Sequence, residues 1–247
     1  MSATILYNNL ASKAISITEN YSYPTYGTAY IVDGNLSTYY QGDVVTPTSI
    51  LFNFGSAVYI DHVLAVTNST TSSTGDILLT AGNTTATSSL STGLFSNGYG
   101  TSYRDFGNYG YQYWKITMVA PTYNNYINEV FLGKKLVITE LPSYPVERNI
   151  EEDTTELISE RGQKWIYLNS NKENWSLNFE NINTTTKNNL FNLYKYTKGN
   201  KSAFWINFDT ENDPFNFEFF NIKDESFVSE EITKNIFNVN MNLEKII

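Results

Sequence analysis

Hydrophobic and polar residues alternate along several stretches of the chain, and this alternation predicts strands. In residues 111–119, YQYWKITMV, every second side chain from Trp114 to Met118 is apolar. Residues 174–180, NWSLNFE, and 237–244, FNVNMNLE, alternate in the same way. Because successive side chains of a strand point to opposite faces, each stretch predicts a strand with one buried and one solvated face.

One stretch has a helical pattern, NTTTKNNLFNLYKYTKGN at 183–200. It begins with capping residues, repeats apolar groups at helical spacing and ends at Gly199, which predicts a helix over about 184–198. Two strands are expected before this helix and three after it, the first two of these within SAFWINF and FNFEFF on either side of a turn-rich segment.

The chain divides into two halves of different chemistry. Residues 1–138 carry a net charge of −2 and residues 139–247 a net charge of −7. The first half has short alternating segments between turn signals, which is typical of an all-β sandwich. We therefore predict a mainly β chain: a β-sandwich domain at 1–138, followed by a small β domain with one α-helix at 139–247.

Composition excludes several classes of function. The net charge of −9, with only 16 Lys and Arg, argues against stable nucleic-acid binding. Cysteine is absent, which excludes disulfides and thiolate metal sites. The N-terminal residues lack a basic leader with an apolar core, and no apolar run is long enough to span a bilayer, so neither Sec export nor membrane insertion is expected.

The second half resembles the minor tail and distal tail protein families of long-tailed bacteriophages over about residues 155–247. The matching pieces, in order, are ELISERGQKW, NWSLNFE, TTKNNLFNLYKYTKG, NKSAFWINF and NIFNVNMNLEKI. Trp205 follows Phe204 directly, whereas the family spaces the two aromatic residues by one. The resemblance implies a structural protein of the virion, made in the host cytoplasm and placed at the tail tip.

What the resemblance implies about partners is a six-membered homo-oligomeric ring between the tail-tube protein and the central hub protein. The acidic half would then line a channel whose negative charge repels passing DNA. The aromatic residues at 198–208 can equally serve only to close the core of their domain.

The first half resembles the discoidin, or galactose-binding-like, jelly-roll fold over about residues 5–138. The matching pieces are AYIVDGNLSTYYQG, SILFNFGSAVYIDHVLAV, YGYQYWKITM and YINEVFLG. The resemblance implies a structural calcium ion as the one expected cofactor. It would be held by side-chain oxygens of Asp33, Thr38 and Glu129 and by the carbonyls of Ile31 and Asn35. The alternative is an Asx-type turn without metal.

Sugar-binding modules of this fold use aromatic and polar loop residues, and tyrosine supplies contact area with a polar end. The candidate residues for binding a cell-surface glycan are Tyr23, Tyr26, Tyr99, Tyr103, Arg104 and Tyr109. The same loops can instead form an interface with a neighbouring tail protein.

No enzyme is expected from the sequence. The single histidine, His62, lies in a predicted strand without a nucleophile motif, and nucleotide-binding, zinc and hydrolase motifs are absent. The main hypothesis is thus a tail-tip ring protein with an outward module. The alternatives are a free lectin or carbohydrate-binding module with an accessory β domain, and a fragment of a glycan-active enzyme.

Overall fold

The computed structural model divides the chain into two compact units. Unit 1 consists of Met1–Tyr7, Val137–Glu211 and Glu218–Ile247, and unit 2 of Asn8–Leu136 and Asn212–Phe217. The structure describes residues 2–21, 27–43, 46–67, 77–93, 95–96, 100–118, 126–143, 146–158, 164–197, 202–213, 216–223 and 227–246. The change of unit at residue 137 lies beside the predicted boundary at 138, but the first seven residues belong with the second half of the chain.

Unit 2 is built around two long strands that bend together, β4 (Thr48–Thr67) and β8 (Gly100–Met118). They pair in antiparallel fashion on both sides of the bend, with register shifts between Asn53 and Val58 and between Ile60 and His62. The smaller elements of the unit are η1 (Ala11–Lys13), β2 (Ser16–Glu19), η2 (Thr28–Val32), β3 (Tyr40–Gln41), β5 (Ile77–Gly82), β6 (Leu90–Gly93), β7 (Phe95–Ser96), β9 (Tyr126–Ile127) and β10 (Glu129–Gly133).

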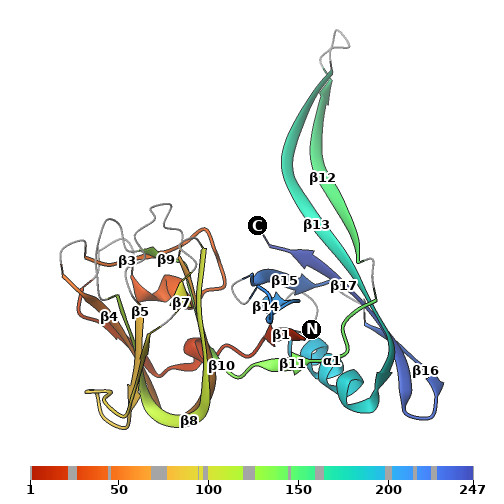
Figure 1. Ribbon diagram of the computed structural model, residues 1–247. Coiled ribbons are helices and arrows are strands. Elements are labelled where there is room, and N and C mark those ends of the chain that lie inside the picture. Colours follow the sequence, from red (N-terminus) through yellow and green to blue (C-terminus); the bar gives the residue numbers. More distant parts are fainter. Residues whose placement is uncertain are drawn as a thin grey trace. The chain divides into compact units, whose positions relative to one another are not determined.

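The bend folds this one sheet into the two layers of a β-sandwich (Figure 1). The first half of β4 pairs with β2 and with the second half of β8, which also pairs with β5. The second half of β4 pairs with β10 and with the first half of β8. Both layers therefore share the same two strands, and their inward faces meet in a single core.

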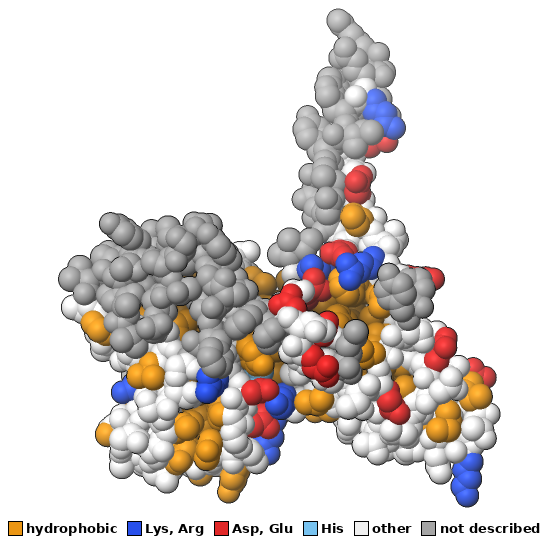
Figure 2. Space-filling view, viewed as in Figure 1, with side chains coloured by type: hydrophobic (Ala, Val, Ile, Leu, Met, Phe, Trp, Pro, Cys, Tyr) orange, Lys and Arg blue, Asp and Glu red, His pale blue; other side chains and the backbone are white. Residues whose placement is uncertain are grey.

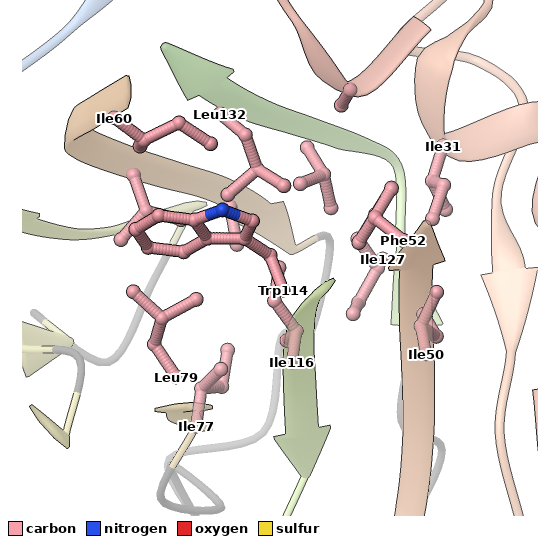
Figure 3. Packing of buried hydrophobic residues seen from close by; sticks show 14 of the residues in the cluster. Ile31, Ile50, Phe52, Ile60, Ile77, Leu79, Trp114, Ile116, Ile127 and Leu132 are labelled. Atoms are coloured by element: carbon pink, nitrogen blue, oxygen red, sulfur yellow. The ribbon is translucent and has the colours of Figure 1, made fainter. Parts of the chain in front are cut away.

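Figure 3 shows this core, in which aliphatic side chains from both layers surround the indole of Trp114. Trp114 is fully buried, and its Nε1–H donates to the carbonyl of Tyr111 at 3.1 Å. Ile116 and Met118, which share its face of β8, are buried as well. The predicted alternation is thereby confirmed over 111–118, and residue 119 lies outside the described residues.

Glycines permit the bend. Gly55 has φ of +73°, a conformation that L-residues with side chains rarely adopt. Across the bend, a Cβ on Gly110 would lie 2.9 Å from the Tyr59 ring, so only glycine lets that ring lie against β8. β4 therefore continues through Gly55, where the glycine lets the strand turn.

Unit 1 is an antiparallel sheet in the order β11-β1-β14-β15-β17-β13-β12, with β16 also pairing with β17. Its strands are β1 (Ala3–Leu6), β11 (Leu136–Ile138), β12 (Glu147–Ile158), β13 (Lys164–Asn183), β14 (Phe204–Asn207), β15 (Glu218–Ile222), β16 (Val228–Thr233) and β17 (Ile236–Lys245). The N-terminal strand lies inside the sheet, where Ile5 and Leu6 are buried opposite Ile206 and Trp205.

Helix α1 (Thr184–Thr197) packs its buried Leu190 and Leu193 on this sheet. The Asn183 side chain accepts a hydrogen bond from the Thr186 N–H at 2.9 Å, which caps the first turn. The predicted helix over about 184–198 is thus confirmed. The expected helix end at Gly199 lies outside the described residues.

The β12–β13 hairpin forms an arm that extends beyond the rest of the unit 1 sheet (Figure 1). β13 has 20 residues, but it pairs with β17 only from Glu173 to Asn183. Its earlier residues pair only with β12 among the described strands. The arm is therefore a two-stranded ribbon that leaves a larger sheet.

The predicted fold class is confirmed: the chain is mainly β, with one α-helix among the described residues and antiparallel sheets. The strand count after the helix was wrong, because β16 makes a fourth strand there. Its six residues are all exposed, and neither Val228 nor Ile232 reaches a core, so the sequence carries no burial pattern that marks a strand.

Candidate functional site

The turn at 33–38 lies against the buried carboxyl of Glu129. Asp33 accepts hydrogen bonds from the Asn35 N–H at 2.9 Å and from the Thr38 hydroxyl at 2.8 Å. Gly34, with φ of +73°, aims its N–H at Glu129 Oε2 over 3.1 Å. The segment is therefore an Asx-type turn that contacts Glu129, an acidic residue far away in the sequence.

Glu129 is held in place by the start of β10. Its Oε1 accepts a bond from Asn9 Nδ2 at 3.3 Å, and its residue is only 4% exposed. Burial, and secondarily the charge of Asp33, raise the pKa of Glu129 to about 8, although the hydrogen bonds from Gly34 and Asn9 act against this rise. At neutral pH this carboxyl keeps its proton unless a cation compensates its charge.

The turn carries oxygens of the type that a hard cation prefers. Two carboxylates, a hydroxyl and a turn rich in carbonyls meet there, and calcium takes oxygen ligands from such turns. Among the residues that the structure describes, no group of three or more His, Asp and Glu side chains could hold a metal ion, so neutral oxygens would have to complete the shell. The side chain of Ile31 is buried in the core (Figure 3), which leaves only its carbonyl for such a role.

The structure describes three of the predicted glycan residues, Tyr103, Arg104 and Tyr109, and these three have different surroundings. Tyr23, Tyr26 and Tyr99 lie outside the described residues. Tyr103 pairs across from Leu64, and its ring packs on His62 and Phe217, with centroids 5.0 and 5.4 Å apart. Arg104 pairs across from Val63, one residue further along β8, where side chains point to the opposite face.

Tyr109 belongs instead to a row of aromatic rings at the bend of β8. Phe106 stacks on Trp114 at 5.8 Å and on Tyr109 at 6.3 Å, and Tyr109 stacks on Tyr111 at 6.2 Å. Trp114 is buried, whereas Tyr109 is 42% exposed. The row thus leads from the core to the surface, where the Tyr109 ring is accessible.

A second exposed tyrosine, Tyr59, flanks the same bend. It is 57% exposed, lies against Gly110 and has the Lys134 ammonium 5.8 Å from its ring centroid. Tyr59 pairs across from Gly110 and Tyr109 across from Ile60, so the two tyrosines point to opposite faces of the sheet. Sequence reasoning missed Tyr59, since its place beside the bend follows only from the pairing of β4 with β8.

One groove of unit 1 is lined by side chains that already contact one another. It has a volume of about 560 Å³ and is lined by residues of β12, β13 and β17 together with Lys223. Arg148 covers the Trp175 ring at 3.8 Å, and Glu151 accepts a bond from Asn174 at 3.1 Å. Acidic and basic side chains alternate near the base of the arm in Figure 2, so this face is not uniformly negative.

Comparison with known proteins finds similarity in fold alone. No family model and no curated protein matches the chain. Solved structures that resemble about half of it include chitosan-binding module 1 of a chitosanase/glucanase from Paenibacillus sp. IK-5, with 18% identity over 52% of this chain and 100% of that chain and a TM-score of 0.43. The lectin domain of lectinolysin, solved with Lewis B antigen, has 13% identity over 51% and 96% of the chains and a TM-score of 0.44.

A fucose-binding module of Streptococcus pneumoniae has 14% identity over 51% of this chain and 95% of that chain, with a TM-score of 0.45. All three are binding modules or lectin domains. Resemblance at this level does not say what this chain binds. In the part of the chain that the structure describes, no helix is long and apolar enough to cross a membrane.

Proposed function

We propose that unit 2 is a carbohydrate-binding module in which the sugar stacks on Tyr109. The observation that carries this proposal is the position of Tyr109, which is 42% exposed in the row of rings that starts at the buried Trp114. Exposed apolar surface that continues from a core to the outside is a candidate binding surface on a soluble protein. Figure 2 shows hydrophobic side chains amid mostly uncharged polar surface on the described part of this unit.

The chemistry suits a neutral sugar. The apolar face of a pyranose ring can pack on a tyrosine ring, and the hydroxyl of the tyrosine remains available for hydrogen bonds. Because Tyr109 stands on a strand and stacks on Phe106 and Tyr111, little side-chain ordering is lost on binding.

Glycan-array binding by single variants tests this assignment. We expect Tyr109→Ala to weaken binding at least about tenfold, the loss typical of an aromatic anchor. Tyr59→Ala, on the opposite face of the sheet, should leave binding unchanged. Tyr30→Ala is the matched control, since Tyr30 is 38% exposed in the same unit but lies on η2. Loss of binding in the Tyr30 variant alone would move the site to the turn end of the sandwich, and no wild-type signal on any glycan would refute the proposal.

We further propose that the turn at 33–38 and Glu129 hold a structural calcium ion. Asp33, Thr38 and Glu129 would supply side-chain oxygens, and Ile31 and Asn35 carbonyls. The positive charge of the ion would compensate the negative charge of the buried Glu129 carboxylate. It would stabilise the fold of unit 2 without taking part in sugar binding at the bend.

A second candidate function is a ring-forming role at a bacteriophage tail tip, with the tail-tube and hub proteins as partners and the virion as location. The arm of unit 1 favours this candidate, because an isolated two-stranded ribbon is marginally stable in water and gains stability from a partner. The homo-oligomer would be a ring of six copies, with the sandwich facing outward toward a cell-surface glycan.

Mass spectrometry of purified virions tests the tail role directly. Detection of this chain in stoichiometric amounts in the particles would support it. Its absence from virions, together with a monomer that binds sugar in solution, would leave the free lectin as the function. The two candidates therefore fail by different measurements.

A further inference from the structure

His62 is buried on the outer face of the sandwich, away from the main core. It lies on β4 and is 0% exposed, with the Phe131 ring centroid 6.4 Å away and the Phe217 centroid 5.8 Å away. The Tyr103 ring lies over it at 5.0 Å. Phe217 is 6% exposed and belongs to unit 2, although residue 218 is the first of the next segment of unit 1.

The two ring nitrogens of His62 are in opposite situations. Nδ1 lies 2.6 Å from Asp105 Oδ1, and the other Asp105 oxygen accepts a bond from Lys135 Nζ at 2.6 Å. Nε2 is buried and has no hydrogen-bond partner. Because Asp105 is an acceptor, a neutral His62 must carry its proton on Nδ1 and leave Nε2 as a bare lone pair among aromatic rings.

Protonation of His62 at Nε2 is unfavourable in the folded chain. The new N–H donor would have no acceptor, and the positive charge would lie in a site that excludes water. The charged and titratable groups that face the ring are Asp61 on β4, Tyr103 and Asp105 on β8, and Lys135 after β10. Asp105 can offset part of the new charge through Nδ1, but Lys135 already engages its other oxygen.

We propose that His62 is a pH-sensitive latch that keeps Phe217 packed on the outer face of unit 2 at neutral pH and releases it in acid. The protonated imidazolium regains water at Nε2 only if the ring that covers it moves away. Of the three rings around His62, Phe217 is the one that can move most easily, since Tyr103 and Phe131 lie in strands that pair with β4. The released state exposes Phe217, Tyr103 and the imidazolium together.

The direction of the equilibrium agrees with this latch. Burial lowers the pKa of His62, and the positive charge of Lys135 adds to this effect, whereas the hydrogen bond and charge of Asp105 oppose it. The pKa of His62 in the folded chain lies below the ordinary value of 6.5. The packing of Phe217 on neutral His62 therefore contributes its full stability above pH 6.5, and this contribution is lost as the pH falls toward the pKa of the folded chain.

Hydrogen exchange of the whole chain, read on peptides that contain Phe217, tests the latch. After correction for intrinsic rates, we expect protection to fall about tenfold or more between about pH 7.5 and 5 in the wild type. In His62→Phe, which keeps an aromatic ring but cannot titrate, protection should not depend on pH. Equal loss of protection in both proteins, or none in the wild type, would overturn the proposal.

Nuclear magnetic resonance keeps the test decisive if His62→Phe does not fold. His62 is the only histidine, so its imidazole signals in the wild type are unambiguous. We expect the imidazole of His62 to titrate with a pKa below the ordinary value. The Phe217 ring signals should shift over the same pH range. Titration at the ordinary value, or without any change at Phe217, would overturn the latch. Asp105→Asn should shift the midpoint further down.

Discussion

Glu129→Gln offers the sharpest test of the turn at 33–38, because ionisation of the buried Glu129 carboxyl lowers the stability of the fold. The pKa of Glu129 is raised from 4.5 to about 8 in the folded chain. A raised folded pKa means that the stabilising contribution of the neutral carboxyl is fully present below 4.5 and is lost as the pH rises through 8. Gln at 129 keeps a neutral side chain of similar shape at every pH.

The magnitude follows from the two pKa values. Each pH unit between them removes about 1.4 kcal/mol, so about 3 kcal/mol of unfolding free energy is lost between pH 4.5 and 7 in the metal-free wild type. The variant should lose none of this. His62 titrates in both proteins, so the difference between their stabilities isolates residue 129.

Thermal denaturation of both proteins at several pH values, with and without calcium, is the assay. With chelator present, we expect the Tm of the variant to exceed that of the wild type progressively as the pH rises from 4.5 to 8. Millimolar calcium at pH 7 should raise the wild-type Tm but not that of the variant. Parallel pH profiles would refute the electrostatic reasoning, whereas absence of a calcium effect on the wild type would refute only the metal site.

Two further predictions concern stability. Asn183→Ala removes the cap on α1 and the bond from Asn183 Nδ2 to Glu140 at 2.9 Å, and we expect a loss of about 1 kcal/mol in urea unfolding; no change would show that water replaces the cap. Gly55→Ala forces a side chain into φ of +73° with its Cβ 3.1 Å from Ile15, and should cost about 1–2 kcal/mol. Gly93→Ala, whose Cβ meets nothing within 4 Å, is the control and should be nearly neutral.

Local patterns in the sequence carried much of the fold. The alternation over 174–180 and 237–244 places Trp175, Leu177, Val239 and Met241 in the core, since a period of two leaves one face for burial. What the patterns did not carry was pairing between distant segments. Nothing in ATIL at 3–6 indicates that this strand enters the sheet of the second half, because pairing partners depend on the whole fold.

The candidate site shows the same division. Glu129 was found because a motif resemblance joined two distant segments, and the structure brings it to Gly34. The glycan residues were chosen by chemical type, and type alone does not separate Tyr103, which packs on His62, from Tyr109, which reaches the surface. Exposure of an aromatic side chain depends on the register of β4 and β8, and this register is set by the bulge and the bend.

The position of β1 determines how the two units can be studied. β1 lies between β11 and β14, so a chain that starts at residue 139 would lack both β1 and β11 and would leave the edge of β14 unpaired. An unpaired edge strand invites association with other chains, and the buried faces of Ile5 and Leu6 would be lost as well. An oligomer formed by such a fragment would therefore report an artificial edge, and the ring-forming role has to be tested with the full chain.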